Sequence, residues 1–300
     1  MNRKITIIGA PMDLGQLRRG VDMGPSAIRC AGAIEELEFL GYEVEDLGDI
    51  HIDRPKTTID EKTGMRNLEA VLRASESLAG KVDDVVQSGS FPLIFGGDHS
   101  IAIGTLAGIA KSYDNLGVIW YDAHTDINTP ETSPSGNIHG MPLAVSLGHG
   151  DEKLVNVGGY FPKIKPENVI IIGARSIDEG EREIIKKLGI KVYTMRDIDR
   201  MGMQAVIEET IQYFKDSRTD GVHLSFDLDS LDPLYAPGVG TPVMGGVSYR
   251  ESHLALEMLS NSDMITSAEF VEVNPILDEK NKTGELAVDL MGTLFGKRLL

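Results

Sequence analysis

Short apolar runs rich in β-branched residues alternate with longer stretches in which apolar residues recur every three or four positions, and this alternation most constrains the fold. Runs such as Val-Ile-Ile-Ile at 169–172 are apolar throughout, as expected of strands buried on both faces. The candidate strands are 4–8, 42–46, 91–95, 116–121, 169–172, 190–193, 221–226 and 264–271. The candidate helices are 26–40, 66–88, 101–113, 179–188, 203–215 and 249–259. We therefore predict an α/β fold of three layers (αβα) with a mostly parallel eight-stranded sheet.

No repeat, low-complexity tract or linker divides the chain, so residues 1–300 are predicted to form a single domain. Two long loops, 126–140 and 232–246, are rich in Gly, Pro, Ser and Thr, and each begins beside a group of acidic residues. Long ordered loops in compact domains tend to be functional. Ligands of open parallel sheets bind beyond the carboxyl ends of the strands, where both loops are expected.

Three segments place metal-binding side chain types at or beyond the ends of apolar runs. These side chains are His99, Asp122, His124, Asp126, Asp227 and Asp229. In an extended chain every second side chain points the same way, so each acidic segment could turn its ligands toward one spot. Four carboxylates and two imidazoles suit a pair of divalent metals, which make a nucleophile from water at neutral pH. The motifs predict metal-assisted hydrolysis.

Taken singly, each segment has a plainer interpretation. His99 could lie in a strand-to-helix turn capped by Asp98 or Ser100, and the acidic segments could be polar strand ends exposed to water. Unpaired buried charge costs several kcal/mol, so carboxylates at the end of a core strand favour bound cations. Because no thiolate belongs to the set, structural zinc and iron–sulfur are disfavoured, and Mn²⁺ is preferred, with Co²⁺ or Fe²⁺ as substitutes.

The charge of the chain excludes some partners. Twenty-nine Lys and Arg against 46 Asp and Glu give a formal net charge of −17, so neither nucleic acid nor an anionic membrane is an expected partner. No run approaches 18 apolar residues, and no signal-type apolar region follows the first residues, so a cytoplasmic location is expected. The single cysteine, Cys30, fits a reducing compartment and is expected to be a buried small side chain.

Two further places could position a substrate. The loop at 128–140 offers amides, hydroxyls and His139, although a surface turn explains the same composition. Glu272 follows an apolar strand and could accept a planar cation in a two-pronged hydrogen bond, or could form an ordinary cap or salt bridge.

Together these segments resemble a known family. They read FGGDHS at 95–100, DAHTD at 122–126 and SFDLDSLDP at 225–233, with APGVGTP at 236–242. Their sequence and order are similar to the three signatures of the ureohydrolase (arginase/agmatinase) family, and the resemblance extends from GAPMD at 9–13 to EVNP at 272–275. The loop NTPETSPSGNIHG at 128–140 resembles the loop with which bacterial arginases hold the α-carboxylate of arginine, a group that agmatine lacks.

The resemblance implies hydrolysis of L-arginine to L-ornithine and urea by a hydroxide that bridges two Mn²⁺ ions. It assigns one metal to His99, Asp122, Asp126 and Asp227, and the other to Asp122, His124, Asp227 and Asp229. It implies catalytic roles for Asp126, His139 and Glu272. It implies substrate contacts for Asn128, Ser133, Ser135, Asn137, Asp178, Thr241 and Glu272. Relatives of the bacterial type also imply a homotrimer or homohexamer. Another ureohydrolase, such as an agmatinase or guanidinobutyrase, is the alternative, and a non-catalytic arginine-binding protein is a more remote one.

Overall fold

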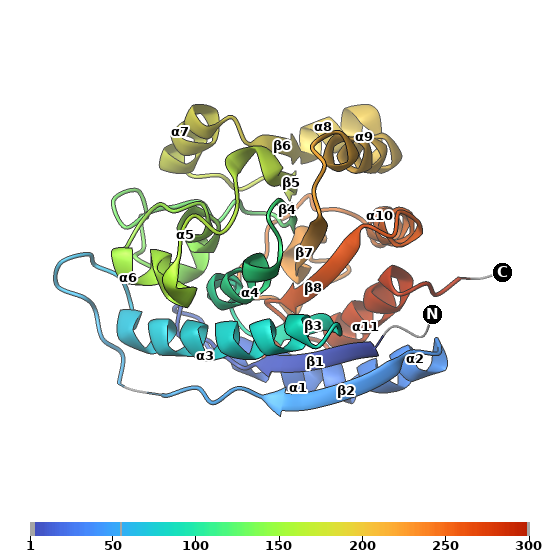
Figure 1. The fold of residues 1–300 in the computed structure, drawn as a ribbon, viewed down its shortest axis with the longest axis horizontal. Helices are drawn as coiled ribbons and strands as arrows, with labels where there is room; N and C mark the ends of the chain where they lie inside the picture. The colour runs from blue at the N-terminus through green and yellow to red at the C-terminus, as the bar shows by residue number, and fades with distance from the viewer. Residues whose placement is uncertain (1–3, 55, 299–300) are drawn as a thin grey trace.

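The computed structural model describes residues 4–54 and 56–298, and its centre is one eight-stranded sheet (Figure 1). The strands are β1 (Lys4–Ala10), β2 (Glu43–Asp49), β3 (Phe91–Gly96), β4 (Leu116–Tyr121), β5 (Val169–Ala174), β6 (Lys191–Thr194), β7 (Gly221–Asp227) and β8 (Ile265–Val271). Their order is β2-β1-β3-β8-β7-β4-β5-β6, and every pair is parallel. The prediction of an eight-stranded, mostly parallel sheet is confirmed.

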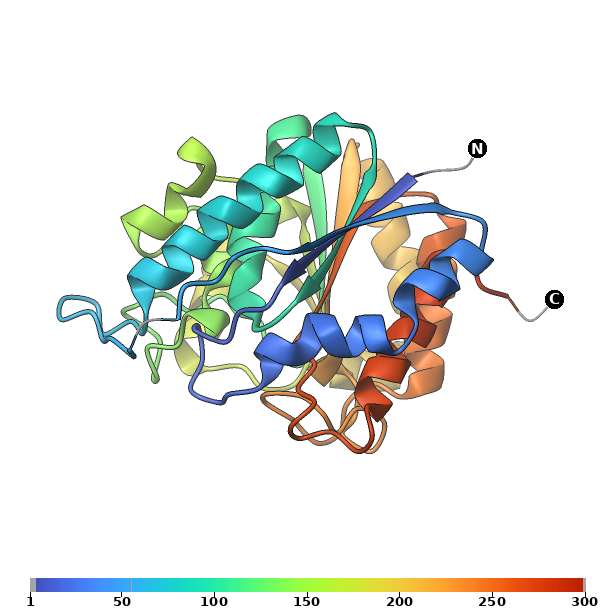
Figure 2. The same ribbon diagram turned by 90° about the horizontal axis from the view of Figure 1, so that it is seen from below.

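Side chains of the strands alternate between two separate hydrophobic cores, as the two-residue period of a strand requires. In β4, Val118 and Trp120 pack into one core, whereas Ile119 and Tyr121 pack into the other. The first core lies under α3 (Leu68–Gln87) and α4 (Ala102–Ile109). Viewed along the sheet, α3 lies on one side and the blue and red helices of the chain ends lie on the other, which gives the predicted three layers (Figure 2).

The second core lies under helices from both ends of the chain. Its helices are α1 (Gly24–Cys30), α2 (Ala33–Phe39), α8 (Met195–Met201), α9 (Met203–Asp216), α10 (Tyr249–Asn261) and α11 (Lys282–Leu294). The remaining helices are α5 (Pro142–Ser146), α6 (Glu152–Val155) and α7 (Glu179–Leu188), together with short 3-10 turns. No helix within 4–54 and 56–298 combines the length and hydropathy needed to cross a bilayer.

Two sequence expectations about this layer are wrong, and one of its helices was not predicted. The helix expected over 26–40 is two helices, because Gly32 has a φ of 92°, a conformation that turns the chain between them. Cys30 is exposed rather than buried; it is the last residue of α1, which buries Ala27 and Ile28 instead. Helix α11 was not expected at all: Gly284 and Gly292 weaken its sequence pattern, yet Gly292 lets the side chain of Glu36 approach closely.

The sheet order brings distant segments together at its carboxyl edge. The neighbouring strands β3, β8, β7 and β4 are followed by the segments that carry His99, Glu272, Asp229 and Asp122, and Asp227 is the last residue of β7. Tyr121 is paired with Phe226 in register, so the two acidic segments leave the sheet side by side. The long loops after β4 and β7 start there and cover the same edge.

Candidate metal centre and substrate cavity

The candidate ligands follow strand ends through turns. Asp227 ends β7, and its side chain accepts from the backbone N–H of Asp229 at 2.7 Å in a 3-10 turn (Leu228–Ser230). The chain leaves β4 at Tyr121, and Asp126 has a φ of 48°. Convergence of the ligands is therefore produced by tight turns, and the expectation of side chains alternating along an extended chain is wrong. A non-glycine residue in the left-handed region is strained, and such residues cluster at functional sites.

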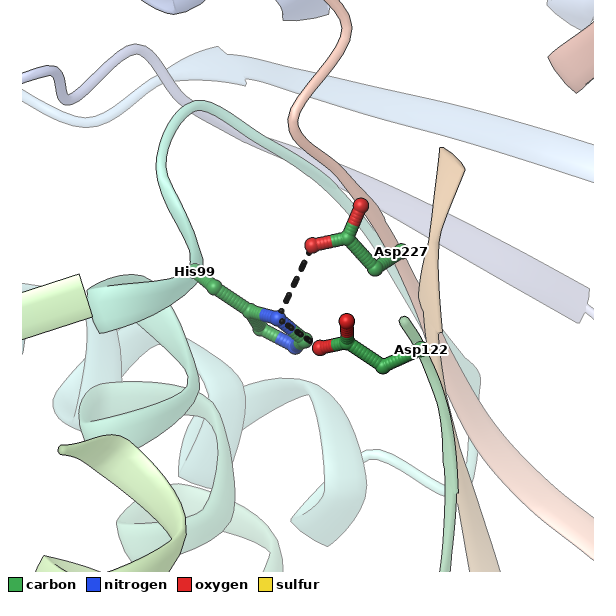
Figure 3. A group of neighbouring side chains, drawn as sticks. All are labelled: His99, Asp122 and Asp227. Carbon is green, nitrogen blue, oxygen red and sulfur yellow. Dashed lines mark ion pairs between the residues drawn. The ribbon is translucent and has the colours of Figure 1, made fainter. Parts of the chain in front are cut away.

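His99 lies at the centre of one group of ligands (Figure 3). Its Nδ1 is 3.1 Å from Asp122 Oδ2, 3.1 Å from Asp227 Oδ2 and 3.0 Å from Asp126 Oδ2. The three carboxylates and the imidazole thus face one point, yet Nδ1 has no hydrogen bond of acceptable geometry. A fully buried nitrogen ringed by carboxylate oxygens and left without a partner is the environment expected of a metal ligand.

His124 belongs to a second group. Its Nδ1 is 3.2 Å from Asp229 Oδ2 and 3.4 Å from Asp122 Oδ1. The atoms that could bind a metal form two sets, His99 with Asp122 and Asp227, and His124 with Asp122 and Asp229, so Asp122 belongs to both. In octahedral coordination at about 2.1 Å, neighbouring ligand atoms are about 3 Å apart. The spacing and the oxygen and nitrogen donors both fit a pair of divalent ions.

The acid–base properties of the group also indicate a need for cations. Burial, with the nearby Asp122 charge second, raises the pKa of Asp126 to about 7. Burial raises the pKa values of Asp227 and Asp229 as well. For Asp122, the adjacent imidazoles of His124 and His99 outweigh burial and hold the pKa well below its usual value. Carboxylates forced toward their neutral form by desolvation regain their charge when a divalent cation binds among them.

The rest of the His99 ring is fixed from behind. Its Nε2 is 2.7 Å from Ser225 Oγ, which donates to Glu269 Oε1 at 2.7 Å. The ring stacks on Trp120 at a centroid distance of 4.1 Å, and the indole N–H donates to Asp122 Oδ2 at 3.0 Å. These partners were not identified from the sequence, where an apolar Trp and a Ser within strands read as ordinary core residues.

Glu272 joins the metal group to the opposite wall. It has a φ of 66°, its Oε1 accepts from the backbone N–H of His99 at 3.0 Å, and its Oε2 accepts from Gln16 at 3.0 Å. His139 Nδ1 lies 3.3 Å from Oε1. Although burial lowers the pKa of His139, the Glu272 carboxylate outweighs it, so the pKa is raised. The carboxylate therefore fixes three other groups, of which Gln16 was missed from the sequence because it lies 256 positions away.

A cavity opens beside the metal group. It is lined by His99, His124, Asp126, Asn128, Ser133, Pro134, Ser135, Asn137, His139, Gly140, Ser176, Asp178, Glu181, Asp227, Thr241 and Glu272. Every residue predicted to contact substrate lies on this wall, whereas Asp122 and Asp229 lie beneath it. Asn128 donates to Asp178 Oδ2 at 2.9 Å, and Thr241 donates to Asp229 Oδ2 at 2.9 Å.

Two lining residues were missed from the sequence, Ser176 and Glu181. Glu181 accepts from the backbone N–H of Asp178 at 2.8 Å and from that of Ile127 at 3.1 Å. The spacing Asp178-x-x-Glu181 is a capping-box pattern and was a usable signal for the start of α7. This pattern did not predict the hydrogen bond from the backbone N–H of Ile127 to Glu181, which joins α7 to the loop after β4. Ser176 had no distinguishing signal.

An all-parallel sheet with flanking helices, whose carboxyl edge gathers four carboxylates and two imidazoles beside a cavity, defines a metal-dependent hydrolase with an α/β fold. The model of the arginase family matches residues 3–296, and the chain belongs to that family.

Individual relatives match over the full length. The arginase of Bacillus subtilis (strain 168) is 69% identical over 300 residues, 100% of this chain and 100% of that protein. The structure of the Bacillus caldovelox arginase is similar with a TM-score of 0.97 at 66% identity, over 99% of this chain and 100% of that chain. The structure of the Entamoeba histolytica arginase has a TM-score of 0.92 at 36% identity, again over 99% and 100% of the two chains.

Proposed function

We propose that this protein hydrolyses L-arginine to L-ornithine and urea at a centre of two divalent metal ions. The observation that carries the proposal is the convergence of three carboxylates on the unpartnered His99 Nδ1, beside a cavity lined by amides and hydroxyls. Membership of the arginase family supports the substrate. The solved structure of the Entamoeba histolytica relative is a complex with L-ornithine, the proposed product.

The proposed ligands are the six identified in the sequence, with Asp122 and Asp227 shared between the ions. The two metal ions, when bound, would lower the pKa of a water molecule at the site, so that a hydroxide nucleophile is available at neutral pH. Asp126 is the proposed proton carrier to the leaving amine. Asp126 lines the cavity and its Oδ2 lies 3.0 Å from His99 Nδ1, so it borders both the proposed metal position and the substrate, as a proton carrier between them must.

His139 and Glu272 are the proposed partners of the substrate on the far wall. Glu272 is 1% exposed, and its Oε2, which among the described residues accepts only from Gln16, retains a lone pair that can orient the guanidinium by a directed hydrogen bond. His139, held beside Glu272 Oε1 at 3.3 Å, lines the same cavity and is the proposed group that exchanges protons with solvent.

The loop after β4 is the proposed determinant of arginine as substrate. Asn128 and Ser135 would donate to the α-carboxylate, and Ser133 and Asn137 would assist through water. Asp178, already 2.9 Å from Asn128 Nδ2, would accept from the α-amino group. An amide, hydroxyls and one carboxylate are the donors and acceptor that a zwitterionic amino acid end requires.

The decisive experiment compares urea release from arginine and from agmatine by the manganese-loaded protein. We expect kcat/KM for arginine to exceed that for agmatine by more than about 100-fold. The loop would donate hydrogen bonds to the charged α-carboxylate of arginine, and each such bond contributes about 1.5–3 kcal/mol. A tenfold preference for agmatine would contradict the proposal and favour an agmatinase. Guanidinobutyrate serves as the second competing substrate.

Ser135→Ala and Asn128→Ala are each expected to lower kcat/KM for arginine about 10- to 100-fold, because each removes one hydrogen bond to the carboxylate. Metal content and turnover of agmatine should stay unchanged. Ser77→Ala, at an exposed position of α3, is the matched control. Kinetics equal to the wild type in both variants would remove the loop from the argument.

A non-catalytic arginine-binding protein on the same fold is the remaining alternative. Such a protein would tend to have lost some of the metal-binding side chains, whereas all six of the proposed metal-binding residues are present here. Fewer than one bound ion per chain after manganese loading, with no urea released, would favour the binding function.

We also propose that the metal is manganese, with Co²⁺ or Fe²⁺ as substitutes, because oxygen-rich sites with imidazoles and no thiolate suit these ions. We further propose that the chain forms a single domain, lies in the cytoplasm and assembles as a homotrimer or homohexamer. Metal analysis of the protein purified without added metal tests the identity of the metal, and sedimentation equilibrium tests the assembly.

A further inference from the structure

Arg175 follows β5 directly and points its guanidinium at backbone. The group donates to the carbonyl oxygens of Asp229 at 2.7 Å, Ser230 at 3.0 Å and Leu231 at 3.2 Å. It also donates to the carbonyl oxygen of Val243 at 2.8 Å and 3.2 Å. A half-buried guanidinium whose hydrogen bonds all end on carbonyl oxygens fixes the path of the chain, because its three nitrogens together bind several peptide groups of different segments.

The two segments bound by Arg175 both contribute to the site. The first is the 3-10 turn of Asp229, whose N–H is already bonded to Asp227 and whose Oδ2 accepts from Thr241. The second contains Val243, two residues after Thr241, on the cavity wall. Arg175 therefore holds the carbonyl end of one ligand residue and the segment that touches the carboxylate of that same ligand.

The positive charge of Arg175 and its hydrogen bonds have opposite effects on the affinity of the site for a divalent cation. Burial lowers the pKa of the guanidinium, while Asp229, Asp122 and Asp232 act to raise it, and the group stays charged at all working pH values. A fixed positive charge beside the ligands repels a divalent cation, so charge alone would weaken metal binding. An ordered turn strengthens it, since a ligand placed in advance loses less entropy on coordination.

We propose that Arg175 is a positioning residue for the metal set of Asp122, His124 and Asp229, and that it acts through the turn rather than through its charge. The proposal rests on the two-metal site proposed above. In the other set, of His99, Asp122 and Asp227, only Asp227 borders the turn, as its N-cap, and Arg175 donates to no atom of these three residues, so the affinity of that set is expected to be almost unchanged. Arg175→Lys keeps the charge and loses the fork, so it separates the two effects.

The test is a titration of the metal-free protein with Mn²⁺, followed by equilibrium dialysis with metal analysis, for the wild type and Arg175→Lys. We expect the variant to bind one ion with wild-type affinity and the other at least tenfold more weakly, at a Tm near that of the wild type. Arg182→Lys, an exposed position on α7, is the matched control. Arg175→Met should weaken the same ion at least as much, although it removes the repelling charge.

Two ions bound by Arg175→Lys with wild-type affinities would overturn this inference alone, as would equal weakening of both. Fewer than two ions in the wild type would overturn the two-metal proposal and this inference with it. Gly246→Ala provides a second route if Arg175→Lys fails to fold. A Cβ there would lie 2.5 Å from Arg175 Nη2 and 2.5 Å from the backbone nitrogen of Asp232, so the variant should displace both the guanidinium and the segment it binds, and weaken the same ion.

Discussion

Asp227→Asn is expected to reduce urea release from arginine by at least about a thousandfold, or about 4 kcal/mol of transition-state stabilisation. Asp227 is 2% exposed, lies 3.1 Å from His99 Nδ1 and accepts from the N–H of Asp229, so its loss disturbs both metal sets. The measurement is the steady-state rate with saturating Mn²⁺, beside the metal content of the same sample.

Asp216→Asn makes the same chemical change on the exposed end of α9 and should leave the rate unaltered. The Tm of metal-free Asp227→Asn is expected to equal or exceed that of the wild type, because a buried carboxyl whose pKa is raised well above its usual value is replaced by a neutral amide. A variant that retains more than a tenth of the rate would exclude Asp227 from the centre.

Manganese is expected to raise the Tm of the protein more at pH 8 than at pH 5. At a free metal concentration about a thousand times the Kd, binding contributes about 4 kcal/mol to the free energy of unfolding. Protons compete with the metal for its ligands, so this contribution should shrink as the pH falls. The measurement is the difference in Tm between metal-loaded and metal-free samples at each pH.

The sign follows from the carboxyl groups of the metal-free protein. The pKa of Asp126 is raised to about 7, and those of Asp227 and Asp229 are raised in the same direction, all by burial first. Their contribution to stability is complete below the ordinary carboxyl pKa of about 4 and is lost as the pH rises through their raised pKa values, which for Asp126 is about 7. Asp122, whose pKa is lowered, contributes fully above about pH 4 and adds no slope in this window.

The imidazoles of His99 and His124 also make the metal-free protein less stable as the pH rises, but over a higher pH range. The carboxylates around His99 and His124 raise their pKa values despite burial, so their contribution is lost above the ordinary value of about 6.5. Asp126→Asn should flatten the pH dependence of the Tm difference between about pH 4 and 7. A metal effect of equal size at pH 5 and pH 8 would show that these groups do not titrate with binding.

The parallel sheet was predictable because burial on both faces imposes a local pattern. Val169 to Ile172 are apolar at every position, and no other class of strand needs that. Helix α11 escaped detection because its helical pattern is interrupted by Gly284 and Gly292, and the second of these allows a close contact with the distant residue Glu36. Single positions in one chain carry no information about such tertiary contacts.

The proposed metal ligands were predictable as residue types, whereas their geometry was not. Asp122, His124 and Asp126 converge because the chain turns after Tyr121, and a positive φ at Asp126 is invisible in the residue name. The supporting groups were out of reach for another reason. Arg175, Gln16 and Glu269 act through partners 44 to 256 positions away, and only the folded sheet order places them together.

The order β3-β8-β7-β4 at the middle of the sheet has a kinetic consequence. Leu93 of β3 is paired with Ala268 of β8, and Tyr121 of β4 with Phe226 of β7, so each pairing closes a loop of more than a hundred residues. Contacts of such high sequence separation form slowly, because chain entropy is lost before the contact is made. The ligands therefore meet only after most of the sheet exists. Bound metal should slow unfolding and leave the rate of folding almost unchanged.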